Sequence, residues 1–216
     1  MIVRQLERKV TDAMAHEQGT GVLTRMVRGV MIDRHGSGPH SAELIETRTE
    51  QAMAFINRYV EAAPEIVASL MDAASDAGLS DDFAPVFLAA EDYFLRSQDY
   101  IPDHLGLAGV TDDAYVVQSL VQRLCDMHHA RTGTRLLSVD LTPANELMRR
   151  MIGEPVATAL DATVYEILIL PDVQTARERM EKSMARLRMR MPQPYEAEMV
   201  SGDDLNLNIG ALAART

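Results

Sequence analysis

The stretch DYIPDHLGLAGVTDD, residues 99–113, decides how this chain folds. It separates two segments whose apolar residues recur at helical spacing, and it contains a proline and two glycines, which interrupt helices. The stretch therefore predicts a corner that joins two helices. Its apolar side chains are expected to enter the core and fix the corner; they are Ile101, Leu105, Leu107 and Val110.

The sequence indicates where each of the two helices that flank the corner begins. Ser80 is expected to open the first, which carries an apolar face to about residue 98. Thr111 is the expected N-cap of the second, which runs to about residue 129. Asp112 and Asp113 then lie in the positive first turn of that helix.

The rest of the chain predicts further helices. Apolar spacing indicates two of them within residues 1–35, and one from Ser41 that Pro64 should end or kink. The run ATVYEILIL, residues 162–170, fits a strand as well as a helix, and helix is preferred because no partner strand is predicted elsewhere. The remaining helices are expected at 64–78, 142–152, 155–170 and 172–191.

Composition agrees with an all-α fold. The 216 residues include 14 methionines, no tryptophan and only 5% aromatic residues, although 47% are hydrophobic. Met-rich, aromatic-poor chains suit helix packing better than strands. We expect a bundle of seven to nine helices. Its predicted parts are N-terminal helices at 1–35, a main helical domain at 41–170, a basic amphipathic helix at 172–191 and a loose tail at 192–216.

The corner also carries side chains that could bind a metal ion. Four carboxylates, which hard cations such as Mg²⁺ or Ca²⁺ prefer as ligands, lie on its two sides, and His104 is a further candidate ligand. The alternative is structural: two carboxylates complement the helix dipole while the other two cap amides of the turn. The spacing is not that of an EF-hand. The candidate metal ligands are Asp99, Asp103, Asp112 and Asp113.

The pattern D-x-I-P-D-x-x-G-x-x-G-x-x-D-D resembles the signature of the YkvA-like domain, a bacterial domain of unknown function. With the flanking helices the resemblance covers residues 79–124, and it implies a helix-corner-helix unit without an established activity. The chain departs from the family at residues 97–98 and 104–106, where relatives commonly have proline. The matching positions are Asp99, Ile101, Pro102, Asp103, Gly109, Asp112 and Asp113.

A second candidate site lies near the C-terminus. Residues 177–190 contain six basic and two acidic side chains, a local charge of +4, and methionines and a leucine form a stripe beside them. Such a helix can dock on an anionic membrane, nucleic acid or an acidic partner. Alternatively, its stripe packs on its own domain while the arginines meet the acidic remainder of the chain or of a second copy. The candidate partner-binding residues are Arg177, Met180, Met184, Arg186, Leu187 and Arg190.

Other classes of function are disfavoured. The net charge of −11 argues against general nucleic-acid binding, and the sequence has no phosphate loop, dinucleotide fingerprint or nucleophile elbow. No apolar stretch is long enough for a membrane span, and Cys125 is the only cysteine, so a reducing, cytoplasmic location is expected. We expect a protein-interaction or regulatory module that associates with itself or with an unidentified protein partner. The alternatives are a divalent-metal enzyme or sensor and a peripheral membrane protein.

Overall fold

The computed structural model describes residues 2–36, 38, 41–76, 80–94, 100–133, 140–183 and 207–214. Within this part of the chain there are nine α-helices and no strand, which confirms the predicted all-α bundle. Residues 162–168 belong to a helix, as preferred. The elements are α1 (Ile2–Thr20), α2 (Val22–His35), α3 (Ala42–Asp76), α4 (Ser80–Phe94), the 3-10 helix η1 (Asp103–Leu105), α5 (Leu107–Thr132), α6 (Thr142–Ile152), α7 (Val156–Leu168), α8 (Pro171–Ser183) and α9 (Ile209–Ala213).

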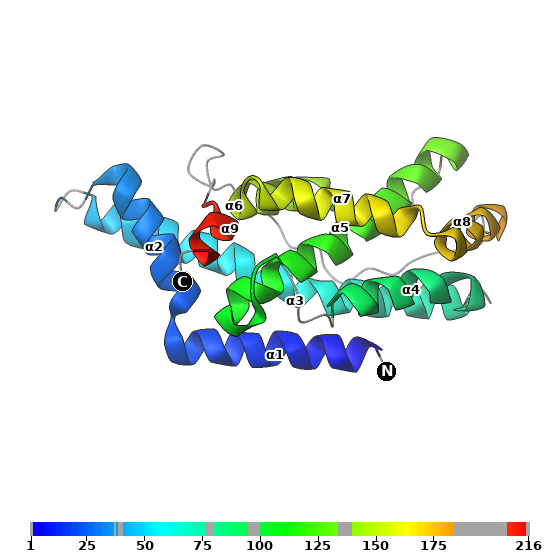
Figure 1. Ribbon diagram of the computed structural model, residues 1–216, viewed down its shortest axis with the longest axis horizontal. Coiled ribbons are helices and arrows are strands. Elements are labelled where there is room, and N and C mark those ends of the chain that lie inside the picture. The colour runs from blue at the N-terminus through cyan, green and yellow to red at the C-terminus, as the bar shows by residue number, and fades with distance from the viewer. Residues whose placement is uncertain are drawn as a thin grey trace.

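Helix α5 passes through the middle of the molecule and packs against α1, α3, α4, α6 and α7 (Figure 1). Every residue from 105 to 121 is buried, because neighbouring helices cover this part of α5 on all sides. Polar side chains within that range are buried as well, so they need hydrogen-bond partners on the surrounding elements. These partners define the two sites described below.

The corner before α5 depends on two glycines. Gly106 has a φ of 63°, in the left-handed region that favours glycine. A Cβ atom on Gly109 would lie 2.5 Å from the carbonyl oxygen of Pro102, so only glycine lets the turn approach the helix this closely. The prediction that Thr111 caps α5 is wrong, because Gly106 starts the helix earlier, at Leu107. The Thr111 hydroxyl instead donates to the Leu107 carbonyl oxygen at 2.8 Å.

Helix α3 continues through Pro64, so the prediction that this proline separates two helices is wrong. A proline inside a helix costs about 3 kcal/mol. Beyond it, Ile66, Val67 and Leu70 are all buried in the core. Because burial of each such side chain contributes about 1.5–3 kcal/mol, packing outweighs the cost of the proline.

The two ends of the described chain belong to the same core. Leu6 and Val10 of α1 and Ile209 of α9 are members of one hydrophobic cluster. Helix α9 contacts α2, α6 and α7, so the prediction of a loose tail is wrong for residues 207–214 (Figure 1). Residues 192–206 lie outside the described part of the chain. None of the helices described here has the length and apolar character that a bilayer crossing requires.

Candidate functional site

The predicted carboxylates of the corner separate into different environments. Asp103 lies in η1, and Asp112 and Asp113 lie within α5, where both are completely buried. Asp99 is outside the described residues. Asp112 accepts a hydrogen bond from the Ile101 backbone N–H at 3.2 Å and so ties the corner to α5. The structural alternative expected Asp99 and Asp103 to cap the amides of the turn, whereas the structure shows Asp112 in this role, from inside the helix.

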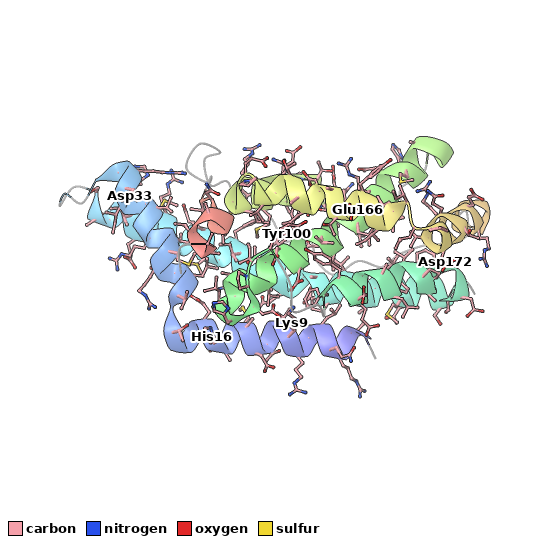
Figure 2. All side chains as sticks on the ribbon, viewed as in Figure 1. Lys9, His16, Asp33, Tyr100, Glu166 and Asp172 are labelled. Atoms are coloured by element: carbon pink, nitrogen blue, oxygen red, sulfur yellow. The ribbon has the colours of Figure 1, made fainter. Side chains whose placement is uncertain are left out.

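Asp103 and Asp113 are brought together by a residue that the sequence did not single out, Lys9 of α1. Its Nζ atom lies 2.8 Å from Asp113 Oδ2 and 3.1 Å from Asp103 Oδ1, and it donates to the Phe94 carbonyl oxygen at 2.7 Å. Figure 2 shows Lys9 on the side of α1 that faces α5. We call Lys9, Asp103 and Asp113 the Lys9 cluster.

The ammonium and the carboxylates of this cluster stabilise one another in their charged forms. Burial by itself lowers the pKa of Lys9, but the attraction and hydrogen bonding of Asp113 and then Asp103 outweigh burial, so the pKa of Lys9 is raised. The ammonium therefore stays charged in the interior and compensates the buried Asp113 carboxylate. Among the residues that the structure describes, no three or more His, Cys, Asp or Glu side chains are grouped to hold a metal ion. The Mg²⁺ or Ca²⁺ site stays a prediction.

Little of the predicted partner-binding helix falls within the described residues. Arg177 lies on α8 with its side chain half-buried, and the backbone of Met180 lies further along the same helix. The other four candidates lie beyond α8, outside the described part of the chain; they are Met184, Arg186, Leu187 and Arg190. The structure does show an exposed apolar surface just before α8, formed by Tyr165, Ile169 and Leu170.

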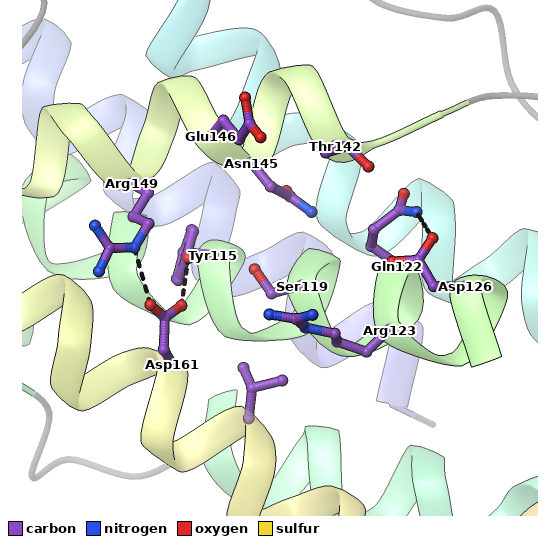
Figure 3. Close-up of a pocket in the computed structure, with 11 residues that line it drawn as sticks. Tyr115, Ser119, Gln122, Arg123, Asp126, Thr142, Asn145, Glu146, Arg149 and Asp161 are labelled. Carbon is purple, nitrogen blue, oxygen red and sulfur yellow. Dashed lines mark hydrogen bonds and ion pairs between the residues drawn. The ribbon is translucent and has the colours of Figure 1, made fainter.

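A pocket of about 260 Å³ opens between α5, α6 and α7 on another side of α5 (Figure 3). We call it the α5–α7 pocket. Most of the side chains that line it carry a polar group, and their apolar parts form about half of the wall. The residues that line it are Tyr115, Ser119, Gln122, Arg123, Asp126, Thr142, Asn145, Glu146, Arg149, Asp161 and Val164.

One side of the pocket is fixed by a network centred on Asp161 of α7. The Tyr115 hydroxyl donates to Asp161 Oδ1 at 2.6 Å, and Arg149 Nε donates to Asp161 Oδ2 at 2.9 Å. Arg149 also binds Glu154 Oε1 at 2.7 Å. Burial, followed by the hydrogen bond to Asp161, raises the pKa of Tyr115, so this phenol stays protonated and acts as a donor. The hydrogen bond to Asp161 is also the largest cause that raises the pKa of Arg149.

The floor of the pocket holds Asn145, which is 8 % exposed. Its Oδ1 atom accepts a hydrogen bond from the Tyr59 hydroxyl at 2.7 Å, which fixes the orientation of the amide. The Nδ2 atom of the same amide has no hydrogen-bond partner in the structure. Figure 3 shows the amide nitrogen turned toward the space between α5 and α6. An unpartnered donor, itself covered by protein atoms, thus lies beneath the floor of the pocket.

The sequence contained a signal for this pocket that was not recognised. Asn145 and Asp161 are polar, yet their neighbours Met148 and Val164 along the same helices are buried. A polar residue at a position on the apolar face of a helix indicates a buried hydrogen bond or a site. Which side chains meet there depends on helix packing, and helix packing is not encoded in local spacing.

Comparison with known proteins gives no further guide. No family model, curated protein or solved structure matches this chain. The resemblance of residues 79–124 to the YkvA-like domain therefore stays a prediction.

Proposed function

We propose that the protein is a cytoplasmic interaction module that associates with a second copy of itself where α7 ends and α8 begins. The observation that carries the proposal is the exposed apolar surface there. Tyr165 is 64 % exposed, and Ile169 and Leu170 are each 45 % exposed. We call these three residues the α7–α8 patch. Large apolar side chains that gather in one exposed place mark protein contact surfaces.

The local geometry favours a single contact surface. Tyr165 and Ile169 are four residues apart, the spacing that places two side chains on the same face of a helix. Leu170 follows directly, before Pro171 opens α8. Acidic residues flank the patch, with Glu166 and Asp172 at this end of the molecule (Figure 2). The patch therefore has the apolar centre and polar rim of a protein interface.

Charge favours a second copy as the occupant. Residues 177–190, which begin within α8, carry a charge of +4, and the whole chain carries −11, so the remaining residues carry −15. A second copy thus offers a net negative charge to the basic segment, which follows the patch in the chain. Opposite charges of this kind steer association and fix its orientation.

The test is light scattering over a range of protein concentrations. The wild-type chain is expected to form a dimer or higher oligomer, and the Tyr165→Ser/Leu170→Ser double variant is expected to remain monomeric. Leu44→Ser is the matched control, because Leu44 is 41 % exposed but lies on α3, away from α7 and α8. Circular dichroism shows whether each variant keeps its helices.

Two results would contradict the proposal. A wild-type chain that is monomeric at every concentration would exclude self-association. A double variant that stays folded and associates as strongly as the wild type would show that the α7–α8 patch is not the contact surface.

A further inference from the structure

We propose that the α5–α7 pocket binds a small zwitterion of the amino-acid type, with one carboxylate and one ammonium group. This function is separate from self-association and rests on the pocket alone. The pocket volume of about 260 Å³ falls below the roughly 300–1,000 Å³ of pockets for drug-sized ligands, so its ligand is small. Five charged side chains line the pocket, and burying them against a purely hydrocarbon ligand would cost free energy.

Two hydrogen-bond donors of the pocket, on Asn145 and Arg123, would bind the carboxylate group of the ligand. The Asn145 Nδ2 atom at the floor has no hydrogen-bond partner in the structure, and a buried donor gains free energy when it meets an acceptor. Arg123 contributes a guanidinium group at the exposed rim on the α5 side. Guanidinium and amide N–H groups are the donors that recognise carboxylates.

Two carboxylates at the rim would bind the ammonium group of the ligand. Glu146 of α6 and Asp126 of α5 both line the pocket and are exposed. Gln122 Nε2 donates to Asp126 Oδ1 at 2.6 Å, but this amide carries no charge to neutralise Asp126. Within the described part of the chain, neither carboxylate forms an ion pair, and Arg123 forms none either. The rim therefore presents separate positive and negative charges to a ligand.

The other charged groups of the pocket are already engaged. Both oxygens of Asp161 accept hydrogen bonds, from Tyr115 and from Arg149. Arg149 is also held by Glu154. This network supplies a rigid wall, which leaves Arg123 and the two rim carboxylates to select the ligand. The mixed charge of the rim disfavours a dianion such as inorganic phosphate.

Isothermal titration calorimetry of the full chain tests the proposal, with the standard amino acids as probes and with propionate and propylamine as single-charge controls. At least one amino acid is expected to bind, and neither control compound is expected to match it. Arg123→Gln and Glu146→Gln are each expected to weaken binding by about tenfold or more, because each removes one charge-assisted contact. Arg150→Gln, an exposed arginine of α6 that does not line the pocket, should bind as the wild type does.

The outcomes that overturn the proposal are distinct. If no amino acid binds at millimolar concentration, the pocket is not such a site. If propionate binds as well as the amino acids do, the site recognises an anion alone. If Arg123→Gln and Glu146→Gln leave the affinity unchanged, binding takes place elsewhere. Because the three substituted residues are exposed, these variants are expected to remain folded, which circular dichroism can verify.

Discussion

Lys9 pairs with two carboxylates of the corner, the fully buried Asp113 and the partly exposed Asp103. Lys9→Met removes the ammonium that lies 2.8 Å from the Asp113 carboxylate, which is 0 % exposed. Breaking a buried ion pair in this way typically costs 3–5 kcal/mol, so we expect the free energy of unfolding to fall by about that amount. Urea denaturation measures the change.

A double-mutant cycle separates the ion pair from the packing of Lys9. In Lys9→Met/Asp113→Asn no charge is left buried at residue 113, so the double variant should be more stable than Lys9→Met alone. If Lys9→Met is as stable as the wild type, the Lys9 cluster does not stabilise the fold.

Gly109 and Gly29 form a matched pair of helical glycines. A Cβ atom at Gly109 would meet the backbone of Pro102 and Asp103, whereas none of the surrounding atoms lies within 4 Å of a Cβ atom at Gly29. Gly109→Ala should therefore lose about 1–3 kcal/mol of stability through overpacking. Gly29→Ala should be neutral or gain up to about 1 kcal/mol. Equal effects in thermal unfolding would show that the corner does not require glycine at residue 109.

Tyr115 gives the fold a pH dependence at the alkaline end. Burial and then Asp161 raise the pKa of Tyr115 above the ordinary tyrosine value of about 10. The unfolded chain then loses this proton at a lower pH than the folded protein does. The contribution of Tyr115 to stability is thus complete below about pH 10 and is lost as the pH rises beyond that value. Tyr115→Phe should flatten the decline of stability above about pH 10, measured by urea denaturation. An unchanged slope would contradict this role, and Tyr100→Phe serves as an exposed control.

At the scale of single residues, the sequence was informative where partners are close in the chain. Asp112 and the backbone of Ile101 are eleven residues apart, and both lie in the stretch identified from the sequence. Lys9 lies 104 residues before Asp113, and nothing in one sequence indicates which distant cation will meet a buried carboxylate. Asn145 and Tyr59, which are 86 residues apart, were missed for the same reason.

At the scale of helices, the predictions held where apolar periodicity was strong and failed where a local signal competed with packing. Pro64 is a helix breaker by its chemistry, yet buried residues on both sides keep α3 continuous. Thr111 and the two aspartates after it resemble the start of a helix, but the positive φ of Gly106 sets the start earlier. Core packing at Pro64 and the backbone conformation of Gly106 thus outweighed the helix-breaking and helix-capping preferences of single residues.

Helix α9 provides a test at this scale. It is only five residues long, so its position depends on the side chains that it buries. Ile209→Ala should cost about 2–5 kcal/mol, because Ile209 is fully buried in the core. Leu212→Ala, at a half-buried position of the same helix, should cost less. If both variants are as stable as the wild type in urea denaturation, α9 does not belong to the core.

At the scale of the whole molecule, α7 connects the two proposed functions. Asp161 and Val164 line the pocket, while Tyr165, one turn after Asp161, belongs to the α7–α8 patch. A ligand in the pocket and a second copy on the patch would therefore contact the same helix. The all-α class followed from composition and periodicity. The patch was not identified, because the sequence alone does not tell which apolar residues of the 162–170 run stay exposed.

Self-association through the α7–α8 patch is tested most directly by hydrogen–deuterium exchange of the wild-type chain at low and high protein concentration. We predict that peptides covering residues 163–175 exchange more slowly at high concentration, while peptides around Leu44 exchange at the same rate in both samples. Identical exchange of residues 163–175 at the two concentrations, or concentration-dependent protection confined to another part of the chain, would contradict the proposal.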